Sequence, residues 1–333
     1  MVQIMKKYTL IPSIISICSL LLMSCSNGKI TDNTLTSNNF QADSAPVDSK
    51  ILGDEPTALA SGIRDNTPVC LVPTASGINV YSNTLSSIDA SNTSEGYVMV
   101  NYKGNNPKVK LQITGNNGVT YTYNLHAGSY ETFPLSSGNG TYKVAVYENV
   151  TGNQYSTALS QNISVNITNT FGPNLYPNQY VNFNAGSKVV SQAMALAAGC
   201  SNDLEVVTSI YNYVTSNITY DHNKAATVQS GYTSNVDEIL TSGTGICLDY
   251  AAVMASMLRS QNIPTRLEVG YAGTAYHAWI STYITDVGWI NGIIQFDGVN
   301  WSLMDPTFAA NTSEQALKSF IGNGTNYKTK YIY

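Results

Sequence analysis

The C-terminal half of the chain carries three residue types that together can perform nucleophilic catalysis. Cys247 is followed by His277 after 30 residues and by Asp305 after a further 28. A thiol, an imidazole and a carboxylate can serve as nucleophile, general base and the group that orients the base. His277 is favoured over His222 as the base, because His222 precedes the cysteine in a polar stretch where no strand is expected. Cys247, His277 and Asp305 are therefore the candidate catalytic residues.

The residues around Cys247 predict that it lies where a loop meets a helix. Small, flexible residues occupy positions 241–246, and a helical run follows over residues 248–258. A helix N-terminus favours a thiolate, and its N–H groups can bind an oxyanion. Asp249 is interpreted as an acidic residue that suits the helix N-terminus rather than as a triad member. Taken alone, this junction is equally compatible with a buried structural cysteine.

Three strands are expected after this helix, and two of them carry the other candidate residues. They span residues 265–271, 276–283 and 301–307. His277 lies in the second strand and Asp305 in the third. Adjacent strands would bring these two side chains together across a sheet. The helix that begins at Cys247 is expected to pack on that sheet, with its first turn near the histidine.

A family resemblance rests on several short motifs in a fixed order. They are Gly245-Ile246-Cys247, Asp249-Tyr250-Ala251, Ile263-Pro264-Thr265-Arg266, His277-Ala278-Trp279 and Asp305-Pro306-Thr307. Together they resemble the core of the bacterial transglutaminase-like superfamily, over roughly residues 187–307. The resemblance implies an α+β papain-like fold with an N-terminal helical part and an antiparallel sheet, placed within residues 171–333.

The resemblance also implies roles for the site residues. Cys247 would attack a carbonyl and form a thioester, His277 would accept and return the proton, and Asp305 would hold the imidazole in place. Tyr220, in a segment that matches the family upstream of the cysteine, is a candidate second donor to the oxyanion. Two tryptophans are expected to pack around the site and shield it: Trp279 and Trp301.

Residues 68–170 predict a separate all-β module. Short runs with apolar residues at every second position, such as residues 97–102 and 109–113, alternate with turn signals. This spacing is typical of an immunoglobulin-like sandwich. His126 stands apart from other ionisable clusters and is interpreted as a surface or turn residue. The module is expected to serve in binding or spacing.

The N-terminus reads as an export signal followed by a tether. Residues 1–24 combine two lysines with a short apolar run and end in Leu22-Met23-Ser24 before Cys25, which resembles a bacterial lipobox. Cys25 would be lipidated, which would anchor the protein to the extracellular face of the bacterial membrane. Residues 25–67 are polar and predict a disordered tether. The sequence leaves open whether Cys70 and Cys200 form a disulfide.

Composition and charge limit which classes of function are possible. The formal charge is -5 and only 11% of residues are charged, so no basic surface for nucleic acid is expected. No cofactor and no metal are predicted. The first hypothesis is an enzyme that hydrolyses or transfers amide bonds in proteins or cell-wall peptides. A non-catalytic surface scaffold is the alternative, and a Cys-His-His endopeptidase is disfavoured because a second downstream histidine is missing.

Overall fold

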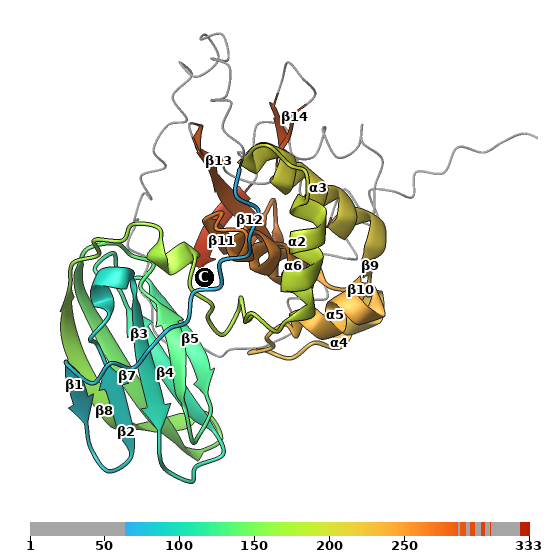
Figure 1. Ribbon diagram of the computed structural model, residues 1–333. Helices are drawn as coiled ribbons and strands as arrows, with labels where there is room; N and C mark the ends of the chain where they lie inside the picture. Colours follow the sequence, from blue (N-terminus) through green and yellow to red (C-terminus); the bar gives the residue numbers. More distant parts are fainter. Residues whose placement is uncertain (1–63, 286, 291–293, 297–300, 304–306, 308–326) are drawn as a thin grey trace, which may run out of the picture.

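The computed structural model of the 333-residue chain describes residues 64–285, 287–290, 294–296, 301–303, 307 and 327–333 (Figure 1). The predicted signal segment, Cys25 and most of the predicted tether lie outside these residues. In the part of the chain that the structure describes, no helix is long and apolar enough to cross a membrane.

The N-terminal module is a β-sandwich of two four-stranded antiparallel sheets (Figure 1, lower left). One sheet has the order β1-β2-β3-β6 and the other β5-β4-β7-β8. The first contains β1 (Val80–Ser82), β2 (Ser86–Asp89), β3 (Tyr97–Tyr102) and β6 (Tyr130–Pro134). The second contains β4 (Val109–Thr114), β5 (Thr120–Leu125), β7 (Gly140–Thr151) and β8 (Gln154–Val165).

The alternation that predicted these strands is also what buries them. In β4, Val109, Leu111 and Ile113 are buried, whereas the residues between them are partly exposed. Successive side chains of a strand point to opposite faces, so one face of each sheet turns to the core. The predicted all-β module is thereby confirmed.

The C-terminal domain combines a helical part with a four-stranded antiparallel sheet. Its helices are α2 (Lys188–Ala197), α3 (Asp203–Asn217), α4 (His222–Thr227), α5 (Val236–Ser242) and α6 (Cys247–Ser260). The sheet has the order β13-β12-β11-β16, formed by β13 (Gly288–Ile290), β12 (Ala275–Ile284), β11 (Thr265–Ala272) and β16 (Tyr327–Ile332). Two short pairs lie outside it: β9 (Thr219–Tyr220) with β10 (Thr244–Gly245), and β14 (Ile294–Phe296) with β15 (Trp301–Leu303).

Helix α6 is the central element of this domain (Figure 1). It packs against β11 and β12 on one side and against α2, α3 and α5 on the others. Every residue from Asp249 to Ser260 is buried, including Arg259. A helix that is surrounded in this way buries all its faces, so its length and position are fixed by tertiary packing.

Arg259 ties together three segments that are distant in sequence. Its guanidinium donates to the carbonyl oxygens of Thr265 at 2.9 Å, Tyr176 at 2.8 Å and Tyr333 at 2.7 Å. Burial lowers the pKa of Arg259 to about 9, so the side chain is still charged at neutral pH. The three carbonyls supply the hydrogen bonds that a buried charge requires.

The structure describes the start of the strand that was expected to carry Asp305. Residues 301–303 pair with β14, whereas the neighbours of β12 in the described chain are β11 and β13. Strand β13 pairs with Thr282–Ile284 of β12 and does not extend to His277. Asp305 lies outside the described residues, so the expected proximity of its strand to the histidine strand stays a prediction.

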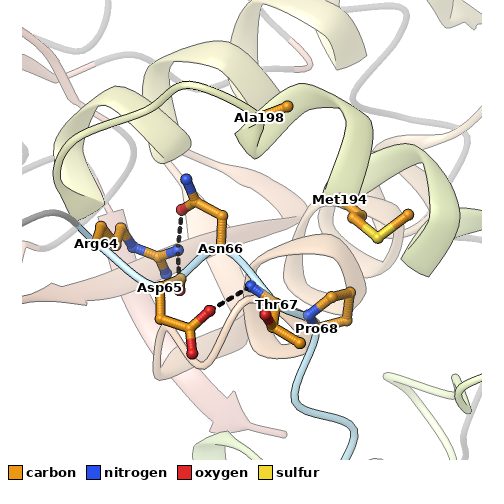
Figure 2. A pocket seen from close by; sticks show the side chains of 7 residues that line it. All are labelled: Arg64, Asp65, Asn66, Thr67, Pro68, Met194 and Ala198. Atoms are coloured by element: carbon orange, nitrogen blue, oxygen red, sulfur yellow. Dashed lines mark hydrogen bonds between the residues drawn. The ribbon is translucent and has the colours of Figure 1, made fainter.

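Residues 64–69 form an N-terminal strap that lies on the C-terminal domain. The guanidinium of Arg64 bonds the carboxylate of Asp203 at 2.8 Å and also donates to the carbonyl of Gln261. Further along, the amide of Val69 donates to the carbonyl of Ser260 at 2.8 Å. Residues 64–68, Met194 of α2 and the adjacent Ala198 line a hollow of about 590 Å³. Figure 2 shows their side chains. The last four residues of the predicted tether, 64–67, thus contact the domain.

A tyrosine cluster joins the sandwich to the C-terminal domain. Tyr121 of β5 lies 5.4 Å from Tyr331 of β16, measured between ring centres, and its hydroxyl accepts from the amide of Ile332. Tyr180, from the connecting segment, stacks on Tyr333 at 3.9 Å. Such ring pairs add to the area that they bury, so the two parts contact each other through a packed interface.

Candidate active site

Cys247 is the first residue of α6, as predicted, and its side chain is 7% exposed. The parallel pair of β9 with β10 holds the segment before it, where Gly245 lies opposite Tyr220. Ile246 is extended and acts as the N-cap. A thiol at a helix N-terminus lies in the positive end of the helix dipole, which favours the thiolate.

His277 lies in β12 and is 5% exposed. Its ring stacks on Trp279 with a centroid distance of 6.2 Å and lies 6.4 Å from the ring of Tyr327. The residue directly opposite on β11 is Gly270, which places no side chain across from the imidazole. A buried histidine with fixed ring neighbours has a restricted orientation, as a general base requires.

Cys247 lies near the end of β12 that carries His277. Helix α6 packs on β12, the strand that carries His277. Tyr276 precedes the histidine, and its pKa is raised, mainly by burial and less by neighbouring tyrosines and by Cys247. Only a nearby group exerts such an effect, because charge interactions weaken with distance. Two predicted site residues are therefore in the same region.

The other predicted residues have different outcomes. Asp305 lies outside the described residues, and only the backbone of Trp301 is described. Trp279 is 3% exposed and packs beside His277, in agreement with its expected shielding position. Tyr220 lies next to the loop that leads to Cys247, but its role as an oxyanion donor stays a prediction.

The competing histidine occupies a different environment. His222 starts α4, is exposed, and has its ring 5.2 Å from that of Tyr220. His126, also exposed, contacts Glu131 in the sandwich at 3.2 Å. His277 is the buried histidine, and it lies on the strand that α6 packs against.

Comparison with known proteins places the central part of this domain in a family. Residues 191–292 match the model of the transglutaminase-like superfamily, "Transglut_core". This span contains Cys247, His277 and the helix–strand order described above. Residues 191–292 form a transglutaminase-like core.

Solved structures resemble the chain only distantly. A candidate cysteine protease from Cytophaga hutchinsonii shares 15% identity over 69% of each chain, with a TM-score of 0.32. The periplasmic domain of TgpA from Pseudomonas aeruginosa shares 14% identity over 73% of this chain and 98% of that domain, with a TM-score of 0.33. Red sea bream transglutaminase shares 14% identity over 65% of this chain and 48% of its own, with a TM-score of 0.30. Among curated proteins, none matches this sequence.

The transglutaminase-like core contains a buried ionic group that the sequence did not reveal. Asp249, in the first turn of α6, has a relative exposure of 0%. Its carboxylate accepts from the Ile246 N–H at 2.9 Å, from Lys224 Nζ at 2.7 Å and from the Tyr232 hydroxyl at 2.7 Å. Asp249 thus caps the helix as expected, but Lys224 and Tyr232 were missed because no local pattern links them to it.

Cys70 and Cys200 are free thiols, so the disulfide that the sequence left open is not formed. Burial raises the pKa of each. Within the described ranges, no group of three or more histidine, cysteine or acidic side chains could hold a metal ion.

Proposed function

We propose that the transglutaminase-like core is a thiol enzyme that acts on amide bonds, with Cys247 as nucleophile, His277 as base and Asp305 as the group that orients the base. The observation that carries the proposal is the position of Cys247. It starts a buried central helix, and that helix packs on the strand that holds the buried His277. The match of residues 191–292 to the transglutaminase-like superfamily supports a thiol enzyme.

The proposed reaction has two steps. First, His277 takes the thiol proton while Cys247 Sγ attacks the amide carbonyl carbon, and the C–N bond breaks as the imidazolium protonates the leaving amine. The product of this step is a thioester on Cys247. Second, water or another amine attacks the thioester carbonyl and gives its proton to His277. The C–S bond breaks and the thiol is restored.

The nature of the substrate follows from the proposed location. We propose a lipid anchor at Cys25 and a site on the extracellular face of the membrane, where proteins and cell-wall peptides carry the amide bonds. Palmitate incorporation in the full-length chain should be lost in Cys25→Ala. Labelling that persists in this variant would contradict the anchor.

Thiol activation can be tested by iodoacetamide alkylation of the full-length chain across a pH series. Modification of Cys247 is read by peptide mass spectrometry, which separates it from Cys70 and Cys200. We expect alkylation of Cys247 at pH values well below the ordinary thiol pKa of about 8.5. His277→Ala should slow this alkylation. A midpoint near the ordinary value that is unchanged by His277→Ala would instead support a non-catalytic scaffold.

Hydrolysis and transfer can then be distinguished with one peptide library. The chain is incubated with glutamine-containing and cell-wall peptides, with and without a primary amine. New carboxylates without amine adducts indicate hydrolysis, and amine adducts indicate transfer. Neither product should form with Cys247→Ala.

A further inference from the structure

The first turn of α6 contains a negative charge close to the proposed nucleophile. Asp249 is two residues after Cys247, is fully buried, and holds the Ile246 N–H at 2.9 Å. This bond fixes the start of the helix. A nearby negative charge nevertheless disfavours a thiolate and opposes the effect of the helix dipole.

Lys224 of α4 lies where it offsets this charge. Its Nζ is 2.7 Å from Asp249 Oδ2, and the side chains of the two residues are 26% and 0% exposed. Burial acts to lower the pKa of Lys224, but its bonds to Asp249 and Tyr232 outweigh that effect and leave the pKa raised. Lys224 is therefore a cation at neutral pH, and the buried pair is neutral overall.

Tyr232 completes the group as a neutral donor. Its hydroxyl donates to Asp249 Oδ1 at 2.7 Å, and Lys224 Nζ lies 4.5 Å from its ring centre. Burial is the main reason that the pKa of Tyr232 is raised to about 12. At neutral pH the phenol is protonated, so the hydroxyl stabilises the carboxylate and adds no charge.

Other titratable groups approach this region from neighbouring elements. Tyr220 of β9 lies beside Gly245, and Tyr276 and His277 lie on β12. Asp221 caps α4 and accepts the amide of Lys224 at 2.8 Å. Among the described lysines and arginines, Lys224 is the one that contacts Asp249.

The sandwich holds the loop that carries Tyr232. Asn124 of β5 donates through Nδ2 to the carbonyl of Gly231 at 3.3 Å. Gly231 has φ +86°, and a Cβ there would lie 2.3 Å from Asn124 Nδ2. A side chain at this position would be both strained and obstructed. The loop is thus fixed on both sides, by Asn124 and by Asp249.

We propose that Lys224 is a positioning residue for Cys247: it cancels the charge of the buried Asp249 carboxylate, so that Asp249 can lock the first turn of α6 without opposing the thiolate. This inference rests on the proposed role of Cys247 as nucleophile. It gives α4 and the loop after it, which carry none of the three proposed catalytic residues, a role in the protonation of the Cys247 thiol.

Four variants of the full-length chain test the proposal through the pH midpoint of Cys247 alkylation, read by peptide mass spectrometry. In Lys224→Met the unpaired Asp249 charge should move the midpoint up by about one pH unit. In Asp249→Asn the midpoint should move down, because Lys224 keeps its charge. The double variant should return close to the wild-type midpoint. Lys188→Met removes a lysine that bonds Thr241 at the surface, and should leave the midpoint unchanged.

The pattern separates charge from structure. If Lys224 acted only as a brace, Lys224→Met and Asp249→Asn would slow alkylation at every pH with one common midpoint, and that result would overturn the proposal. An equal midpoint in wild type and Lys224→Met would do the same. If Lys224→Met does not fold, two other variants still decide the question. The midpoint of Asp249→Asn should fall, and that of the double variant should return to the wild-type value, whereas a brace would leave both at one common midpoint. An ordinary wild-type midpoint refutes the proposed function itself, and is a different outcome.

Discussion

Replacing Arg259 by methionine should destabilise the C-terminal domain strongly. Methionine fills a similar length of the buried site but donates no hydrogen bonds. The carbonyls of Thr265, Tyr176 and Tyr333 would each lose a donor that now lies at 2.9, 2.8 and 2.7 Å. The carbonyl of Tyr333 keeps the backbone N–H of Leu267 at 3.1 Å, so the carbonyls of Thr265 and Tyr176 are the ones left unpaired. A buried acceptor left unpaired costs about 1–3 kcal/mol, so the two together cost at least ~2 kcal/mol.

One effect opposes this loss. Removing a buried charge also removes its desolvation penalty, and well-packed apolar replacements of buried ion pairs can be neutral or stabilising. Here the partners are backbone carbonyls, which remain in place and cannot be replaced along with the arginine. We therefore expect a net loss of about 2 kcal/mol in the free energy of unfolding.

Urea unfolding monitored by tryptophan fluorescence measures this loss in the C-terminal domain, which contains Arg259. All three tryptophans, Trp279, Trp289 and Trp301, belong to the C-terminal domain, so the signal excludes the sandwich. Arg259→Lys should lose less stability, since one ammonium can still reach a carbonyl. Lys188→Met is the surface control, and should change stability by less than about 0.5 kcal/mol. An Arg259→Met variant within about 1 kcal/mol of wild type would refute the reasoning, because two unpaired buried carbonyls could not cost so little.

Three further outcomes are expected. Gly270→Ala should weaken the attachment of β16 to β11, because a Cβ there would lie 2.1 Å from the carbonyl oxygen of Lys328; hydrogen exchange of the β16 amides measures this, and unchanged protection would contradict it. Tyr220→Phe should slow acylation by peptide substrates and leave iodoacetamide alkylation of Cys247 intact; equal slowing of both would show that the hydroxyl does not act on the oxyanion. The pKa values of Tyr142 and Tyr232 are raised to about 12 by burial, so their contribution to stability is present below pH ~10 and is lost as the pH rises through 12. Denaturation followed by circular dichroism from pH 9 to 12.5 should show that loss, and constant stability across this window would exclude it.

Local patterns predicted the elements that hold the site. Alternating apolar residues indicated the strands that became β11 and β12, and small residues before a helical run indicated the start of α6 at Cys247. These signals work because strand and helix periodicities are read within a few residues. The all-β module was predictable for the same reason.

Contacts between distant segments were not predictable. Lys224 and Tyr232 reach Asp249 only because α4 and its following loop fold back onto the start of α6. Strand β16 joins β11 across a long intervening segment, and no periodicity in Tyr327–Ile332 names its partner.

The N-terminal strap contacts the end of α6 that lies away from Cys247. Arg64 is fastened to the carbonyl of Gln261, the residue that ends α6, whereas Cys247 begins that helix. A helix of 14 residues extends about 21 Å, so the strap and the thiol lie at opposite ends of a rigid rod. An attachment through the residues before Arg64 would therefore act at the C-terminal end of α6. If those residues lead to the proposed membrane anchor, the chain leaves the domain beside the end of α6 that lies away from the thiol.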